Sequence, residues 1–229
     1  MLVGIPVLGM PLRIEDYALI GDTRTAALVG RDGSIDWLFV PRFDSAACFA
    51  ALLGDREHGR WRLAPSAEVT RVERRYRDGT LVLETEFETA DGAARVIDCM
   101  PQPEGKTEVA RVVERLRGRV AMETEHRVPF LLSWYPSAER PPGPLDVERA
   151  VAETERWWID WSERCNAGGE WRDVVTRSLI TLKALTYGPT GGIVAAPTTS
   201  LPEQAGRRAQ LGLPLLLAAR RDAHVARAD

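Results

Sequence analysis

The sequence predicts a mainly β protein that ends in helices, and three observations carry this prediction. Asp-Gly pairs recur through the first 130 residues, apolar and polar residues alternate strictly between two of them, and the spacing becomes helical after residue 146. Asp-Gly pairs supply the positive φ of tight hairpins, and alternation with a period of two is typical of a half-buried strand. We therefore expect an antiparallel sheet domain followed by helices.

The strands are expected around three hairpin turns. The Asp-Gly pairs stand at residues 32–33, 78–79 and 91–92. Between the last two, "TLVLETEFET" places Leu81, Leu83, Thr85 and Phe87 on one face and Glu84, Glu86 and Glu88 on the other. Such a pattern predicts a strand with one face in the core and an acidic face in solvent. "SIDWLFVPRF" is expected to be a buried strand that ends at Pro41, and "VARVVERLRG" is a weaker strand candidate.

Helical spacing follows a proline-rich linker. "YPSAERPPGPLD" (135–146) is the linker, and Asp146 can cap the helix after it. The first helix carries an apolar stripe of Val147, Ala150, Val151, Thr154, Trp157, Trp158 and Trp161. A second helix is expected over residues 170–187, with Trp171, Val174, Val175, Ser178, Leu179 and Leu182 on one face. The tryptophans are interpreted as core packing or, alternatively, as an aromatic platform for a sugar ring, and both stripes need partners.

Composition excludes several functional classes. The 229 residues carry a net charge of -3, and no basic block precedes residue 205, so nucleic acid is not an expected partner. Cys48, Cys99 and Cys165 are widely spaced, which predicts free thiols in a reducing compartment and no metal site. The apolar run 211–219 is too short to span a membrane, and residues 1–17 lack the features of a signal peptide. A cytoplasmic protein without a cofactor is expected.

An active enzyme of another class has little support. The sequence contains no HExxH, phosphate-binding glycine loop or nucleophile elbow. His58, His126 and His224 stand apart from one another. We expect no catalytic residue of such a class.

A long resemblance covers most of residues 12–204. "RIEDYALIGDTRTAALVGRDGSIDWLFVPRFDSAACFAALLG" resembles the N-terminal domain of bacterial glucoamylase-like and trehalase-like proteins of glycoside hydrolase family 15. The similarity continues through "HGRWRLAP", "RRYRDGTLVLETEFET", "RVPFLLSWYPS", "AETERWWIDWSERC" and "TLKALTYGPTGGIVAAPTTSLPEQ". The resemblance implies a β-sandwich, a linker helix and an (α/α) barrel whose two glutamates act as general acid and general base on α-glucosides.

The chain departs from the family pattern in two places. Strands that the family has after "RVAMETE" are missing, since Glu125 runs directly into His126, and this predicts an incomplete sandwich. The second departure is the tail. The sequence that the family has after the "SLPEQ" segment is absent here. When that family sequence is back-translated into GC-rich codons and read from the last base of its first codon, the shifted frame encodes residues 210–221 of this chain. The tail is therefore expected to be frameshifted.

These observations divide the chain into five parts. They are an upstream extension (1–9), the sandwich (10–134, with the deletion near 125/126), the linker and its helix (135–169), the start of the barrel (170–204) and the frameshifted tail (205–229). Residues 170–187 would then be the first helix of the barrel, and the catalytic glutamates would lie outside the sequence. No catalytic residue can be nominated within it.

Two functions follow as hypotheses. The first is a truncated, inactive α-glucoside hydrolase whose parent family binds α-glucosides or oligosaccharides. The alternative is a non-catalytic module that binds carbohydrate or docks on a protein, with Asp36, Trp37 and Asp44 as candidate contacts. A structural explanation of the same residues places Trp37 in the core and lets Asp44 cap a short helix. Because deletion of strands exposes sheet edges, self-association through those edges is expected.

Overall fold

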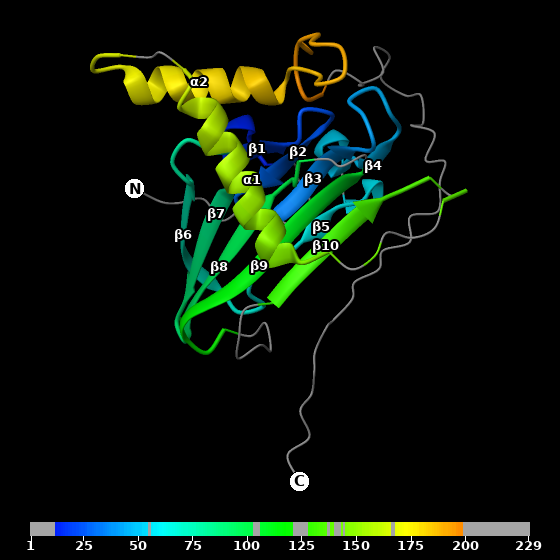
Figure 1. Ribbon diagram of the computed structural model, residues 1–229. Coiled ribbons are helices and arrows are strands. Elements are labelled where there is room, and N and C mark those ends of the chain that lie inside the picture. The colour runs from blue at the N-terminus through cyan, green and yellow to red at the C-terminus, as the bar shows by residue number, and fades with distance from the viewer. Residues whose placement is uncertain are drawn as a thin grey trace.

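The computed structural model of the chain describes residues 12–54, 56–102, 106–120, 128–136, 138–139, 143, 145–165 and 168–198. It confirms a mainly β fold with helices at the C-terminal side (Figure 1). The strands are β1 (Tyr17–Gly21), β2 (Ala26–Gly30), β3 (Ser34–Phe39), β4 (Ala47–Phe49), β5 (Trp61–Arg62), β6 (Val69–Tyr76), β7 (Leu83–Thr89), β8 (Gly92–Cys99), β9 (Thr107–Gly118) and β10 (Val128–Trp134). The helices are α1 (Val147–Ser162) and α2 (Arg172–Ala184), with short 3-10 turns η1 (Ile14–Asp16), η2 (Ala51–Leu53) and η3 (Arg56–His58). The extension 1–9, the junction 125/126 and the tail 205–229 lie outside the described residues.

The strands form two antiparallel five-stranded sheets. One has the order β1-β2-β3-β4, with β5 pairing to β3, and the other has the order β10-β9-β8-β7-β6. Two of the expected Asp-Gly turns have the positive φ that favours glycine, 81° at Gly33 and 71° at Gly79. At the third pair, Asp91-Gly92, the expected positive φ is not found, because Gly92 is the first residue of β8 and has no positive φ.

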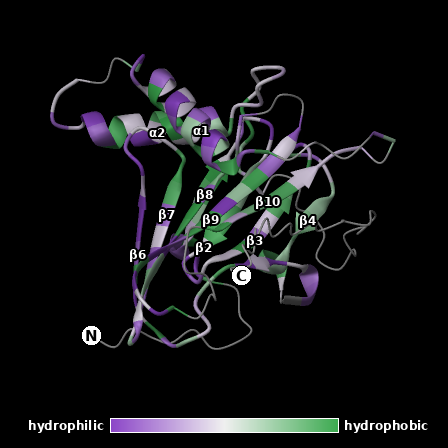
Figure 2. Cartoon of the chain, turned by 60° about the horizontal axis from the view of Figure 1, so that its bottom comes forward, coloured by the Kyte–Doolittle hydropathy of each residue, from purple (hydrophilic) through white to green (hydrophobic). Residues whose placement is uncertain are grey.

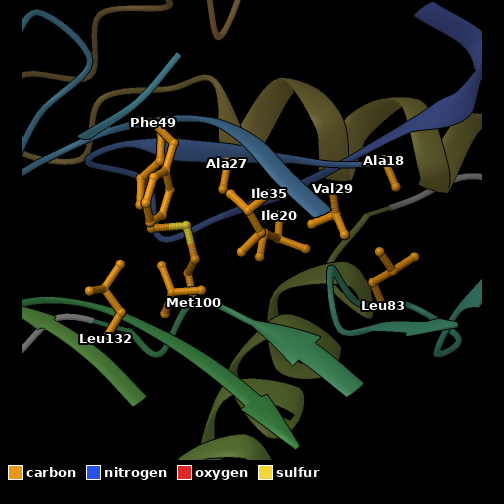
Figure 3. Close-up of a cluster of buried hydrophobic side chains, with 11 residues drawn as sticks. Ala18, Ile20, Ala27, Val29, Ile35, Phe49, Leu83, Met100 and Leu132 are labelled. Carbon is orange, nitrogen blue, oxygen red and sulfur yellow. The ribbon is translucent and has the colours of Figure 1, made fainter. Parts of the chain in front are cut away.

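The main core lies between the two sheets. Apolar side chains of the first sheet, among them Ile20, Val29 and Ile35, meet Leu83 of the second sheet and Met100, which directly follows β8 (Figure 3). Alternation along β1, β2, β7 and β9 places every second residue in this layer, as period-two patterning requires. The packing of one inner face on the other makes the fold a β-sandwich.

Helix α1 covers the outer face of the second sheet. Val147 and Val151 pack on Val82, Ile97, Cys99, Ala110 and Val112, and Figure 1 shows the helix crossing β7, β8 and β9. Asp146 caps the helix as predicted, since its carboxylate accepts a hydrogen bond from the backbone N–H of Arg149. Trp158 is fully buried beside Leu81 and Ile180. The apolar stripe of α1 is therefore covered within the chain, and Trp158 packs in the core.

The acidic face of β7 is only partly solvent-exposed. Glu84 is 4% exposed, and its carboxylate is ion-paired with Arg75 and Arg77 at 2.7 and 2.9 Å. Arg77 also reaches Glu155 of α1 at 2.6 Å. The expectation of a solvent-facing acidic row is wrong for Glu84, because neighbouring arginines and α1 cover it. Figure 2 shows the contrast between the hydrophilic edge strand β6 and the more hydrophobic β8 and β9.

Candidate functional site

The candidate site begins at an irregularity in β3. Val29 pairs with Ile35 and Leu28 pairs with Trp37, so Asp36 is an extra residue on β3. This is a β-bulge, which re-aims the side chains that follow it. Ile35 and Leu38 point into the main core, whereas Trp37 joins a separate cluster with Phe39 and Ala50. The bulge therefore turns the indole of Trp37 away from the layer between the sheets.

Trp37 connects two segments that are 160 residues apart. Its indole is 0% exposed, and Nε1 donates a hydrogen bond of 2.9 Å to the carbonyl oxygen of Pro197. Phe39 packs edge-on against the ring, with 4.7 Å between centroids. The hydrogen bond joins the "GSIDW" segment to the "GGIVAAPTT" segment, so residues 193–198 lie against the first sheet.

A second connection is made by residues 21–25 between β1 and β2. Thr23 has a φ of 66°, and its carbonyl oxygen accepts a hydrogen bond of 2.7 Å from the N–H of Gly188. Asp22 organises the loop, since its Oδ1 accepts from the backbone N–H groups of Arg24 and Thr25, both at 2.8 Å. This is an Asx turn. The loop thus holds the segment that follows α2 on the end of the sandwich.

The carboxylates of this region differ in their surroundings. Asp36 is 6% exposed, and its Oδ2 accepts a hydrogen bond of 2.8 Å from the hydroxyl of Tyr17. Oδ1 of Asp36 and Oδ2 of Asp22 are buried and have no hydrogen-bond partner among the described residues. Burial, followed by the hydrogen bond to Asp36, raises the pKa of Tyr17. Burial also raises the pKa of Asp22 to about 6, against the opposing effect of the two backbone N–H groups.

The third predicted contact lies elsewhere. Asp44 is exposed in the turn after β3, where its carboxylate accepts a hydrogen bond of 2.8 Å from Nε of Arg42. The element that follows Asp44 is β4 and not a helix, so its expected capping role is not observed. The hydrogen bond from Arg42, which outweighs the small effect of burial, lowers the pKa of Asp44. Asp36 and Trp37 are therefore adjacent on β3 but bind different partners, Tyr17 and Pro197, and Asp44 is a surface ion-pair residue.

Sequence reasoning missed two groups. Asp22 stands in the quoted stretch "GDTRTAAL", and an Asp between two apolar runs is a signal for an Asx turn. The other is a fully buried ion pair between Asp98 and Arg111, with Nε to Oδ1 at 2.7 Å. Arg111 also donates to the carbonyl oxygens of Trp61 and Gly33, at 2.7 and 2.9 Å. Arg111 therefore links the second sheet to the first. The pattern of "VARVVERLRG", in which Arg111 lies, did not predict this contact.

A hollow of about 330 Å³ lies where β6 ends and β7 begins. Arg75, Tyr76, Arg77, Asp78 and Glu84 line it. Although burial opposes the shift, hydrogen bonds from Arg75 and Arg77 lower the pKa of Glu84. Within the described ranges no group of three or more His, Cys, Asp or Glu side chains could hold a metal ion. A search of the described residues also finds no helix that could cross a membrane.

The fold and the site define an antiparallel β-sandwich whose loops hold the helical segment that follows it. The profile of the family described as "Trehalase-like, N-terminal" matches residues 8–127. The chain belongs to this family of trehalase-like N-terminal domains. No solved structure matches the chain significantly.

Curated relatives extend the similarity beyond the matched domain. The chain is 27% identical to "Trehalase" of Mycolicibacterium smegmatis over 275 aligned positions, which cover 83% of this chain and 40% of the relative. It is 29% identical to "Trehalase" of Thermoplasma volcanium, over 88% of this chain and 42% of the relative. It is 30% identical to "Trehalase 1" of Sulfolobus acidocaldarius, over 85% of this chain and 42% of the relative. The chain therefore spans about two fifths of the length of these relatives.

Proposed function

We propose that this chain is the sandwich and helical connector of a trehalase-type α-glucoside hydrolase, and that it does not itself hydrolyse a glucoside. The observation that carries the proposal is the match to relatives named trehalase, which takes in 83% of this chain but only 40% of the M. smegmatis protein. An inverting glycosidase needs one carboxyl group held in the protonated form and a second one facing it. Glu84, the buried carboxylate of the hollow, has a lowered pKa because Arg75 and Arg77 stabilise its charged form.

The outward face of α2 supports the role of a connector. Trp171, Val174 and Leu182 are 65%, 61% and 49% exposed, whereas Ile180 and Ala184 on the opposite face are fully buried. An exposed apolar stripe on a helix marks a surface that another element covers. In our proposal the stripe receives the helices of a following domain, which would make α2 the first barrel helix, as the sequence predicts.

The length of the alignments supports the predicted internal deletion. The alignment with the M. smegmatis relative has 275 positions but takes in 83% of a chain of 229 residues, so it contains many positions to which this chain contributes no residue. A deletion near 125/126 would account for part of this difference. The free thiols of Cys48, Cys99 and Cys165 support a cytoplasmic, reducing location.

The test is glucose release from trehalose and from maltose by the purified chain. We expect no glucose release above that of a mock preparation, which controls for contaminating hydrolases. Saturable hydrolysis above the mock preparation would overturn the proposal, and its loss in Glu84→Gln would in addition assign the chemistry to the hollow.

A carbohydrate-binding module is the second candidate, and the unpartnered Oδ1 of Asp36 favours it. This oxygen is buried, so a sugar hydroxyl could donate to it only after the surrounding residues move, and the indole of Trp37 is already engaged with Pro197. Calorimetric titration with maltooligosaccharides tests the candidate. Binding that Asp36→Asn removes and Asp44→Asn leaves intact is the expected outcome for a module of this kind, and absence of heat at millimolar sugar eliminates it.

A further inference from the structure

The loop of residues 21–25 is the meeting point of three segments that are distant in sequence. Thr23 accepts the N–H of Gly188, and the carbonyl oxygen of Arg24 accepts the N–H of Phe43 at 3.1 Å. The hydroxyl of Thr25 donates to the carbonyl oxygen of Phe39 at 2.6 Å. A rearrangement of this loop would therefore reach both the turn after β3 and the segment after α2.

Asp22 determines the conformation of this loop. Its Oδ1 accepts hydrogen bonds from two backbone N–H groups, and Thr23, inside this turn, has a φ of 66°. Positive φ is uncommon for a residue other than glycine and costs free energy, so it persists only where the surroundings maintain it. Gly188 lies close to Thr23, since a Cβ built on Gly188 would stand 3.0 Å from Oγ1 of Thr23. The contact depends on the shape that the Asx turn gives to the loop.

The carboxyl group of Asp22 is poorly placed to carry a charge. The residue is 0% exposed, and its Oδ2 has no partner among the described residues. A buried anion with one unsatisfied oxygen is costly, whereas the neutral acid costs much less. The charged group that acts on it is Arg24 of the same loop. The ionisable residues of the turn after β3 are Arg42 and Asp44, which pair with each other. The segment after α2 contributes Tyr187, and the guanidinium group of Arg42 lies over the ring of Tyr187.

We propose that residues 21–25 form a protonation-dependent latch, in which the neutral acid of Asp22 keeps the loop closed on Gly188 and loss of its proton to solvent weakens that contact. The latch links acidity to the seating of residues 187–192 on the sandwich. Because the pKa of Asp22 is raised to about 6, the closed loop loses stability as pH rises from 3.8 to about 6, and the loss is complete a little above that pH. Since the open loop exposes the carboxyl group to water, its pKa returns there to the ordinary value of 3.8 and the open state gains as pH rises.

Hydrogen exchange of the Gly188 amide, expressed relative to its intrinsic rate at each pH, tests the latch in the full chain. Protection is expected to fall about tenfold between about pH 5 and 7.5 because the carboxyl group is charged more easily in the open state. In Asp22→Asn, whose side-chain oxygen can still accept the two backbone N–H groups, protection should not change with pH. Asp44→Asn, a carboxylate of the adjacent turn, should behave like the wild type.

Two results would overturn the latch. One is wild-type protection at Gly188 that stays constant over this range, and the other is the same tenfold change in Asp22→Asn. If Asp22→Asn does not fold, the carboxyl ¹³C shift of Asp22 followed against pH in the wild-type chain decides the matter. An ordinary titration near pH 4, uncoupled from the Gly188 amide, refutes the proposal.

Discussion

The buried pair of Asp98 and Arg111 should be the most sensitive charged site in the sandwich. Both side chains are 0% exposed, and Arg111 bonds to Asp98 at 2.7 and 3.2 Å while also holding the carbonyl oxygens of Trp61 and Gly33. Replacement of Arg111 by Met keeps much of the volume but leaves the buried carboxylate of Asp98 without its ion-pair partner and removes the donor to the carbonyl oxygen of Trp61, whereas the carbonyl oxygen of Gly33 still accepts the N–H of Leu63. Breaking a buried ion pair costs about 3–5 kcal/mol, and loss of the hydrogen bond to the carbonyl oxygen of Trp61 adds about 1 kcal/mol.

Arg111→Met should therefore lower the free energy of unfolding by about 4–6 kcal/mol, a large part of the roughly 5–15 kcal/mol that holds an ordinary domain together. The double variant Arg111→Met/Asp98→Leu removes both charges and should recover part of this loss, because a buried pair is often replaceable by apolar residues. Urea unfolding followed by circular dichroism measures all three proteins. Arg71→Met is the matched control, since Arg71 pairs with Glu73 on an exposed edge and its loss should change stability by less than about 0.5 kcal/mol.

A loss of less than about 1 kcal/mol in Arg111→Met, the value expected for an exposed pair, would contradict this role of the buried pair. A double variant less stable than Arg111→Met alone would also contradict it, because the unpaired charge of Asp98 would then not be the source of the loss. Either result would mean that the two sheets are not joined through the guanidinium group.

Three further changes test other parts of the fold. Gly33→Ala should destabilise strongly, by more than about 2 kcal/mol, because φ is 81° and the added Cβ would lie 2.2 Å from the carbonyl oxygen of Leu63; the midpoint of urea unfolding measures this, and a neutral effect would contradict the turn geometry. Trp37→Phe should leave the sheets folded but increase hydrogen exchange in residues 193–198, since the indole donor to Pro197 is lost; unchanged exchange would show that this bond does not hold the segment. Asp146→Ala should cost about 1 kcal/mol through loss of the cap of α1, whereas Asp146→Asn should be almost neutral, and equal losses in thermal unfolding would contradict capping.

Local elements of this fold could be predicted from the sequence, because local patterns determine them. The alternation in "TLVLETEFET" predicted β7, and Asp146 before an apolar stripe predicted the start of α1. The partition of strands into two sheets was less accessible, since it depends on pairing between segments far apart in sequence. The candidate site was only partly foreseen for the same reason. Trp37 was singled out, yet its orientation depends on the bulge at Asp36 and its partner is 160 residues away.

Buried charges were the least predictable feature. Local sequence gives no sign that Asp22, Glu84 and Arg111 are buried, but neighbours in the folded structure cover each of them. Glu84 is covered because three arginines and α1 converge on the outer face of β7. Arg111 is buried because the bulge-containing first sheet supplies carbonyl acceptors opposite it. Such arrangements depend on how the two sheets stack, which no local pattern specifies.

In our proposal the helical segment after the sandwich is part of the same folded unit and presents α2 to a following domain. Arg177 is the sharpest probe, because its guanidinium group lies 4.3 Å from the ring centroid of Tyr76 and donates to the carbonyl oxygen of Thr80 at 2.7 Å. Limited trypsin digestion followed by mass spectrometry measures how fast the chain is cut after Arg177 relative to Arg111 in β9. If α2 belongs to the same folded unit as the sandwich, we expect equally slow cleavage after Arg177 and after Arg111. Rapid cleavage after Arg177 while the bond after Arg111 stays intact would contradict it.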